Sequence, residues 1–190
     1  RDSLSGGKIE KEEEKMEATL YDLKNRRSVR KYKTEQIKKE ELEKILEAGT
    51  YAPTGMGMQS PKIVVVQDKE TISKLSKLNA RFEPGSEEED TFYGAPTVLI
   101  VLADKSRPTY IEDGSLVMGN LLNAAYALGV GSCWIHRAKE MFEAEEGKEL
   151  LKAWGLDAEQ YAGIGNCILG YADEEAVPAE PRKSDYIVFV

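Results

Sequence analysis

The residues with the clearest potential for chemistry are seven consecutive ones, 25–31. They read Asn-Arg-Arg-Ser-Val-Arg-Lys, so three guanidinium groups, one ammonium group and one hydroxyl lie close together along the chain. Guanidinium groups make paired, charge-assisted hydrogen bonds to phosphate oxygens, and a serine hydroxyl can donate one more. The segment predicts a phosphate site built from Arg26, Arg27, Ser28 and Arg30. The alternative is a solvated helix end, where basic residues interact favourably with the helix dipole.

The rest of the chain is acidic, which limits the kind of anion that this basic segment can bind. Among 190 residues, 34 acids outnumber 26 lysines and arginines and give a formal net charge of −8. This balance is the opposite of the basic surface that binds nucleic acid, so we expect a small phosphate ligand and no nucleic acid. No apolar run reaches the ~20 residues that span a bilayer, so we expect no membrane segment.

The side chains that commonly bind metal ions are few. The chain has one histidine, His136, and two cysteines, Cys133 and Cys167, with no Cys-x-x-Cys pair, so we expect no metal site. Both cysteines lie in apolar, strand-like runs, which predicts buried free thiols in a reducing compartment and makes the cytoplasm the expected location. His136 is either an acid that acts near neutral pH or a surface or capping histidine.

A second candidate binding segment is the loop 52–61, which reads Ala-Pro-Thr-Gly-Met-Gly-Met-Gln-Ser-Pro. Its prolines and glycines impose a tight backbone path that a planar ligand can approach closely. Thr54 and Gln59 add polar groups, and Met56 and Met58 can pack on an aromatic ring. An ordinary connection between a helix and a strand is the alternative interpretation.

The spacing of apolar residues predicts the elements that must position these segments. Helices are expected over 16–24, 39–51, 69–79, 111–128 and 139–154, and strands over 63–66, 97–102, 132–135, 161–171 and 187–190. The β-branched run 63–66 indicates a central strand covered on both faces. The helix 111–128 is apolar almost all round, which is typical of a core or a subunit interface. The polar segment 81–93 is expected to be an exposed, mobile loop. This order of elements predicts a layered α/β sandwich.

The length of the chain fits one domain and is too short for two ordinary ones. Residues 1–15 are polar and highly charged, and we interpret them as a disordered extension or an expression remnant. Residues 16–190 are then expected to form a single domain. The sequence contains neither Gly-x-Gly-x-x-Gly nor the P-loop pattern, so a phosphate must be held in another way.

The order of the motifs resembles the nitroreductase family of flavoproteins. Arg-Arg-Ser-x-Arg at 26–30 is similar to the family's opening motif, and 52–61 is similar to its Ala-Pro-Ser-x-x-Asn-x-Gln-Pro-Trp loop. Gly57 stands where the family usually has the asparagine that helps organise the flavin site across the dimer, and Ser60-Pro61 stands where it often has Pro-Trp. Further similar segments are Leu78-Asn79, 93–96, 124–135, 169–171 and Pro181-Arg182-Lys183, so the resemblance covers roughly residues 20–190.

The resemblance implies a fold, a cofactor and a reaction. The fold would be an α+β, three-layer α/β/α sandwich around a central mixed sheet. FMN would bind non-covalently, and electrons from NADH or NADPH would pass through it to a small planar acceptor such as a nitroaromatic or a quinone. The alternatives are a family relative with different flavin chemistry, such as dehalogenation, or a non-catalytic flavin-binding module. A homodimer with FMN sites at its interface is also implied.

The resemblance further implies which residues hold the cofactor, and it leaves the chemistry to the flavin rather than to a catalytic side chain. The basic segment would hold the phosphate, and Arg182 or Lys183 would close the site. The loop 52–61 would come from the partner subunit, and main-chain groups of 133–136 would contact the flavin ring. The implied set is Arg26, Arg27, Ser28, Arg30, Pro53, Thr54, Gly55, Met56, Gly57, Gln59, Asn79, Cys133, Trp134, Ile135, His136, Arg182 and Lys183.

Overall fold

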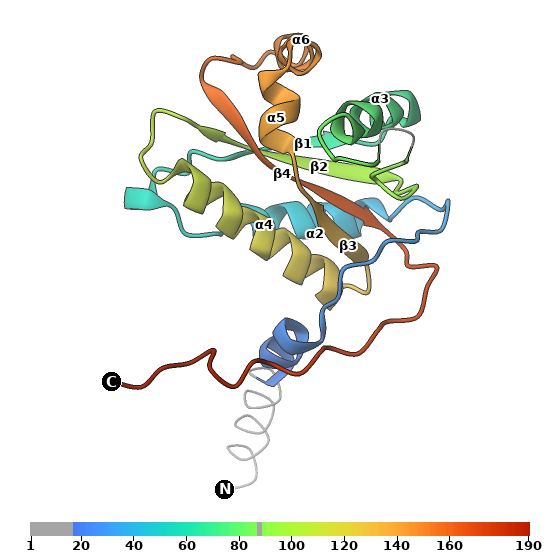
Figure 1. Cartoon of the computed structure of the whole chain (residues 1–190), viewed down its shortest axis with the longest axis vertical. Helices are drawn as coiled ribbons and strands as arrows, with labels where there is room; N and C mark the ends of the chain where they lie inside the picture. Colours follow the sequence, from blue (N-terminus) through green and yellow to red (C-terminus); the bar gives the residue numbers. More distant parts are fainter. Residues whose placement is uncertain (1–16, 87–88) are drawn as a thin grey trace, which may run out of the picture.

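A four-stranded sheet forms the centre of the computed structural model, which describes residues 17–86 and 89–190 (Figure 1). The strands β1 (Lys62–Val66), β2 (Thr97–Asp104), β3 (Gly131–Ile135) and β4 (Tyr161–Gly170) lie in the order β1-β2-β4-β3. All three pairings are antiparallel. The parallel component expected of a mixed sheet is confined to one bridge, between Ser28 and Ser132. The expectation for residues 1–15 lies outside the described residues.

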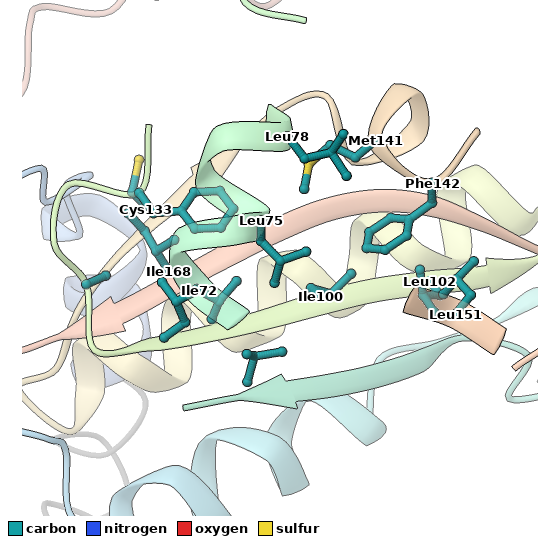
Figure 2. Close-up of a cluster of buried hydrophobic side chains, with 14 of the residues drawn as sticks. Ile72, Leu75, Leu78, Ile100, Leu102, Cys133, Met141, Phe142, Leu151 and Ile168 are labelled. Atoms are coloured by element: carbon teal, nitrogen blue, oxygen red, sulfur yellow. The ribbon is translucent and has the colours of Figure 1, made fainter. Parts of the chain in front are cut away.

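Helices cover both faces of this sheet, as the three-layer prediction requires (Figure 1). On one face lie α2 (Lys39–Thr50) and α4 (Tyr110–Ala127), and on the other lie α3 (Lys69–Ala80), α5 (Ala138–Glu143) and α6 (Glu145–Ala153). On the second face, Leu75 and Leu78 of α3 pack with Ile100 of β2 in one apolar cluster (Figure 2). The α+β class and the α/β/α layers are confirmed.

The two central strands of the sheet are β2 and β4, and the prediction of a central strand at 63–66 is wrong. Residues 98–103 of β2 are completely buried, because alternate side chains enter the two opposite cores. β1 instead lies at the edge, and its Val65 keeps 40% of its surface exposed. A β-branched run indicates a strand, but the run itself carries no information about which neighbours that strand will have.

The segment 139–154, predicted as one helix, forms the two helices α5 and α6. Ala144 between them is extended, with φ −71° and ψ 153°. The break brings the two helices so close that a Cβ on Gly147 would lie 1.9 Å from the main-chain oxygen of Met141. The charged surface pattern runs continuously through both helices, so the sequence pattern conceals the break.

The C-terminal segment 171–190 contains no strand, so the prediction of a strand at 187–190 is wrong. Ile187 and Phe189 are 70% and 92% exposed, and neither pairs with a strand of the described chain. A strand forms only where its main-chain groups find partners. After Tyr171 the chain instead runs antiparallel to residues 31–33, with hydrogen bonds from Lys33 N to Tyr171 O and from Asp173 N to Lys31 O, and then passes the helix 17–25 (Figure 1).

The segment 81–93 is only partly the exposed, mobile loop that its composition predicts. Thr91 and Phe92 are buried, and Phe92 is completely inaccessible. The Asp90 carboxylate accepts hydrogen bonds from the Ser76 hydroxyl at 2.7 Å and from the main-chain N–H of Gly94 at 2.7 Å. The prediction is wrong for Thr91 and Phe92, which are buried, while Asp90 and Tyr93 on either side are exposed as expected. Among the described residues, no helix has the length and apolar character needed to cross a membrane.

Candidate functional site

A cavity of about 760 Å³ lies beside the basic segment 25–31. Its other walls are the end of α4, the start of β3 and the C-terminal segment. The side chains predicted to hold phosphate come together here, since Arg26, Arg27, Ser28, Arg30 and Arg182 all line it. Ser132 of β3 joins them, whereas Lys183 does not line the cavity. Residues separated by about 150 positions in the sequence therefore meet in one place, as the motif order suggested.

The basic segment is held in place by its contacts with β3. Ser28 bridges to Ser132, and the main-chain N–H of Val29 donates to Ser132 O at 3.0 Å. The Tyr32 hydroxyl donates to Val29 O at 2.6 Å. Burial raises the pKa of Tyr32 far above its usual range, so this hydroxyl stays a neutral donor. The segment is therefore fixed against the edge of the sheet.

Arg26 carries the clearest sign of a missing anion. Its Nη1 is buried and has no hydrogen-bond partner among the described residues. Native proteins rarely leave such a donor unpaired, and an unpaired charged one is more costly still. A phosphate oxygen supplies the acceptor and the charge that this atom lacks.

Arg27 has a different task from Arg26. Its guanidinium donates to three main-chain oxygens, those of Lys24 at 2.9 Å, Arg26 at 2.6 Å and Val177 at 3.2 Å. It therefore joins the basic segment to the C-terminal segment that forms the opposite wall of the cavity. We infer that Arg27 shapes this cavity more than it contacts a ligand.

Carboxylates also line the cavity, which the sequence reading did not anticipate. Glu174, Glu175 and Glu180 lie on its C-terminal wall. The Glu174 carboxylate accepts a hydrogen bond from the main-chain N–H of Arg30 at 2.6 Å. An anion that enters the cavity must compete with this carboxylate for the donors of the basic segment.

The loop 52–61 lies apart from the arginine cavity. Thr54 and Gln59 line a second, smaller cavity of about 340 Å³, together with apolar residues that include Leu46 and Ile63. No described residue lines both cavities. Within one chain, the predicted residues Pro53, Thr54, Gly55, Met56, Gly57 and Gln59 are thus not assembled with the predicted phosphate ligands.

The backbone of this loop explains why Gly57 can stand where relatives have asparagine. The turn Gly55–Gly57 is a 3₁₀ helix, and Gly57 has φ +65°. Glycine and asparagine are the residues that adopt this left-handed conformation most readily. A Cβ at position 57 would meet nothing within 4 Å. The exchange therefore removes a side chain without requiring a different backbone.

Asp113 of α4 anchors the loop, although the sequence reading did not single it out. Only 3% of the surface of Asp113 is exposed. Its carboxylate accepts hydrogen bonds from Gly55 N at 2.8 Å, the Ser60 hydroxyl at 3.3 Å and the Thr109 hydroxyl at 3.2 Å. Gly55 approaches so closely that a Cβ there would lie 2.2 Å from Thr109 Oγ1. An acid in the first turn of a largely apolar helix, directly after Glu112, was the available sequence signal for this residue.

We expect Asp113→Ala to destabilise the protein by about 1–3 kcal/mol, because the Gly55 N–H loses its acceptor in a buried place. Urea denaturation measures the loss, and limited proteolysis should show faster cleavage within 54–60. The matched control is Asp113→Asn, whose Oδ1 still accepts from Gly55 while the two hydroxyls turn to accept from its amide. An alanine variant as stable as the asparagine variant would contradict the anchoring role.

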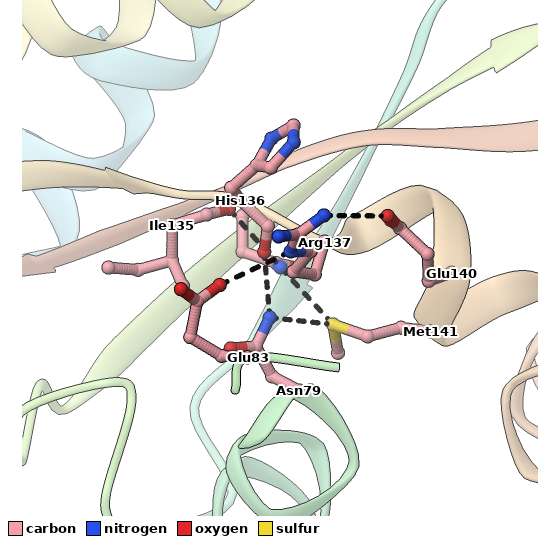
Figure 3. Close-up of polar contacts among 8 residues, drawn as sticks. Asn79, Glu83, Ile135, His136, Arg137, Glu140 and Met141 are labelled. Carbon is pink, nitrogen blue, oxygen red and sulfur yellow. Dashed lines mark hydrogen bonds and ion pairs between the residues drawn. The ribbon is translucent and has the colours of Figure 1, made fainter. Parts of the chain in front are cut away.

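A third group of predicted residues lies where β3 ends (Figure 3). The Asn79 amide is buried and donates from Nδ2 to His136 O at 2.7 Å. Arg137 follows in a left-handed conformation, φ +72°, and forms ion pairs with Glu83 at 3.2 Å and Glu140 at 3.1 Å. The hydrogen bonds that Arg137 donates to Glu83 and, with a smaller effect, to Glu140 raise the pKa of Arg137, which keeps it charged. His136 itself has an exposed side chain.

Two residues of the predicted set, Cys133 and Trp134, direct their side chains into the two opposite cores. Cys133 is 1% exposed and belongs to the apolar cluster beneath α3. Trp134 packs on the opposite face of the sheet, where a Cβ on Gly165 would lie 2.7 Å from its Nε1. These two side chains are therefore not available to a ligand, and the expected main-chain contacts of 133–136 stay a prediction.

Comparison with known proteins shows which family combines the basic segment, the loop 52–61 and this fold. A model of the nitroreductase family matches residues 23–171. The chain belongs to the nitroreductase family. A nitroreductase of Bacteroides fragilis, whose crystal structure contains bound FMN, is 30% identical and has a TM-score of 0.81, over 90% of this chain and 98% of that one.

Two further nitroreductase relatives show how varied the similar proteins are. A protein of Archaeoglobus fulgidus, provisionally named NADH dehydrogenase/NAD(P)H nitroreductase, is 34% identical over 125 residues, which are 63% of this chain and 68% of that protein. The iodotyrosine deiodinase of Thermotoga neapolitana is 30% identical over 138 residues, 60% of this chain and 71% of that protein. The nitroreductase resemblance drawn from the motifs is confirmed for family and fold.

Proposed function

We propose that this protein is an FMN-dependent oxidoreductase that takes electrons from NADH or NADPH and passes them to a small planar acceptor, such as a nitroaromatic or a quinone. The observation that carries this proposal is the buried, unpaired Nη1 of Arg26 in a cavity that it shares with Ser28 and Arg182. A bound FMN phosphate would satisfy that donor. The FMN in the Bacteroides fragilis neighbour supports the choice of ligand.

We assign the phosphate and the flavin ring to opposite ends of β3. Ser132 lies beside the arginines, and His136 lies four residues further along the chain. At the rise of an extended strand, these two residues are roughly 13 Å apart. β3 is an edge strand, and beyond the bridge from Ser28 to Ser132 no further strand of the described chain covers its outer side.

At the ring end, this chain supplies donors and an acceptor. The main-chain N–H groups of residues 136 and 137 can donate to the polar edge of the flavin ring. The Asn79 amide uses its Nδ2 on His136 O, and its Oδ1 has no partner among the described residues, so it can accept from a ring N–H. The chemistry that FMN supplies when bound is hydride acceptance from the nicotinamide and electron delivery to the acceptor.

We further propose a homodimer in which the loop 52–61 of one chain completes the site of the other. Four large apolar side chains in or near this loop and on α4 are exposed to solvent. The exposed fractions are 78% for Tyr51, 91% for Met56, 54% for Ile111 and 47% for Leu116. Apolar surface of this kind is typical of a protein interface. A second copy would cover it and bring Pro53 to Gln59 to the flavin, which no single chain does.

We place the protein in the cytoplasm, with residues 16–190 acting as one FMN-binding domain. Cys133 and Cys167 are both buried free thiols, which fits a reducing compartment. Burial raises the pKa of Cys167 well above its usual range, so this thiol is a poor nucleophile and has no part in the proposed reaction.

Anaerobic mixing of the FMN-loaded protein with NADH or NADPH tests the proposed function. We expect the visible flavin absorbance to bleach with at least one nucleotide and to return when a quinone or a nitroaromatic is added. Protein that binds no FMN would refute the proposal. FMN that binds but does not bleach would indicate the non-catalytic module.

One alternative chemistry has a specific observation in its favour, the similarity to the iodotyrosine deiodinase. The same experiment separates it from the proposed reaction. A reduced flavin that is reoxidised by iodotyrosine, but by neither quinones nor nitroaromatics, would indicate reductive dehalogenation instead.

We expect Glu174→Gln to tighten FMN binding, because the variant removes a negative charge from the wall that faces the phosphate. The carboxylate is solvent-exposed, so the gain should be modest, about two- to fivefold. Flavin fluorescence titration measures it. The matched control is Glu175→Gln, which removes a charge from the same cavity but no hydrogen bond to Arg30. Weaker FMN binding by the Glu174 variant would show that its bond to Arg30 maintains the site.

A further inference from the structure

The buried amide side chain of Asn79 lies beneath the turn that follows β3 (Figure 3), and a second buried amide, that of Asn166, contacts the last residue of β3. Asn79 comes from α3 and Asn166 from β4, and they are 2% and 0% exposed. Asn79 donates to His136 O at 2.7 Å, and Asn166 donates to Ile135 O at 3.5 Å. Both amides also contact Met141 Sδ, at 3.2 and 3.3 Å. Two consecutive carbonyl groups, those of the last residue of β3 and of the residue that follows it, are thus held from the protein interior, and the first also lies in the β3–β4 pairing, where Ile135 stands opposite Asn166.

This arrangement determines where the N–H groups of the turn point. In a planar trans peptide the C=O and the N–H of one unit point in opposite directions. Since the carbonyls of Ile135 and His136 are held inward, the N–H groups of His136 and Arg137 point outward. Neither N–H has a hydrogen-bond acceptor within the described part of the chain. The turn therefore presents two adjacent donors without partners.

Asn166 is retained at a cost to stability, which indicates a purpose other than packing. Its Oδ1 is buried and has no partner among the described residues. An unsatisfied buried acceptor costs about 1–3 kcal/mol. The neighbours of Asn166 along β4 are Gly165 and Cys167, and the residues opposite it on β2 and β3 are Ile100 and Ile135. An apolar residue would therefore fit this position without that cost.

We propose that Asn79 and Asn166 are positioning residues that aim the N–H groups of His136 and Arg137 at the flavin N5. This inference rests on the proposed function, because it needs FMN at the end of β3. Neither amide has to touch N5, since each acts through the carbonyl that it holds. A donor at N5 polarises the atom that receives the hydride.

The affinity for 5-deaza-FMN relative to FMN tests this proposal by binding alone. The analogue has a C–H in place of N5 and keeps the phosphate, the ribityl chain and the remaining ring. We expect the wild-type protein to bind FMN about three- to tenfold more tightly than 5-deaza-FMN, the equivalent of one hydrogen bond. In Asn79→Leu and Asn166→Leu the two affinities should become equal to within about twofold. General damage to the site would weaken both ligands alike and leave their ratio unchanged.

Three accompanying measurements keep the test decisive. Asn166→Leu should unfold at the same temperature as the wild type or higher, because its unpaired acceptor is gone. If either leucine variant fails to fold, Asn79→Ser and Asn166→Ser replace it, since serine is too short to reach the turn. The matched control is Ser76→Ala, which removes a buried hydroxyl one turn earlier on α3, on the side of Asp90, and should keep the wild-type ratio.

The possible outcomes are separate from those for the proposed function. A wild-type ratio near one, with FMN bound, would overturn the assignment of the N–H groups to N5 and leave FMN binding intact. An unchanged ratio in both asparagine variants would overturn the positioning role. Absence of FMN binding by the wild-type protein would overturn the proposed function and this inference together.

Discussion

Replacing Arg26 with alanine is expected to weaken FMN binding by about a hundredfold or more. A guanidinium contributes about 1.5–3 kcal/mol for each hydrogen bond to a charged partner, and a paired contact with phosphate has two of them. The stability of the apoprotein should not fall, because Nη1 of Arg26 has no partner there to lose. A loss of affinity without a loss of stability is the specific sign of a ligand-binding arginine.

Fluorescence titration with FMN, together with thermal unfolding of the apoprotein, measures both effects. The matched control is Lys31→Ala, which removes the same charge from the same segment. The Lys31 ammonium lies 3.5 Å from Asp173, is well exposed and does not line the cavity, so FMN affinity should change less than about threefold. Equal effects of the two substitutions would contradict a direct contact between Arg26 and the phosphate.

The second large effect is expected for Gly163→Ala, which should destabilise the protein by about 3 kcal/mol or more. A Cβ on Gly163 of β4 would lie 2.2 Å from the carbonyl oxygen of Ala138 and 2.5 Å from its carbonyl carbon. These are main-chain atoms of α5, so a rotamer change cannot relieve the clash and the whole helix has to move. FMN affinity should fall as well, because α5 begins directly after the turn at 136–137 and carries Met141.

Thermal unfolding measures this effect, with an expected decrease of roughly 6–12 °C in Tm for a chain of this size. The matched control is Gly119→Ala in α4, which adds the same methyl group where no atom lies within 4 Å. Its helix should gain up to about 1 kcal/mol. A Gly163 variant with wild-type Tm would contradict the close packing of α5 on β4.

Much of the fold follows from local patterns in the sequence. The apolar spacing predicts α2, α3 and α4 to within one or two residues of their observed ends. The positions of strands within the sheet are not local properties. A run such as 63–66 shows that a strand forms, but its place at the sheet edge depends on pairings with distant segments. The residues at 187–190 have strand character and find no partner in the described chain, so the same pattern has a different outcome.

The residues of the candidate site also differ in how far they could be predicted from their sequence neighbours. The basic segment could be recognised because its side chains are adjacent in the sequence, and its resemblance to a family motif supplied Arg182. Asp113 and Asn166 were missed, because their importance depends on main-chain groups more than 25 residues away. A polar residue within a largely apolar helix or strand was the signal that each of them offered. The carboxylate of Glu174 in the cavity had no such signal.

The most direct test of the phosphate site is the relative affinity of the wild-type apoprotein for FMN and riboflavin, measured by isothermal titration. The two ligands share the ring and the ribityl chain and differ only in the phosphate. If the cavity beside Arg26 holds the phosphate, one FMN binds per chain, at least about a hundredfold more tightly than riboflavin. Salt should narrow that difference only slightly, because the contacts are partly buried. Equal affinities for FMN and riboflavin would contradict the account.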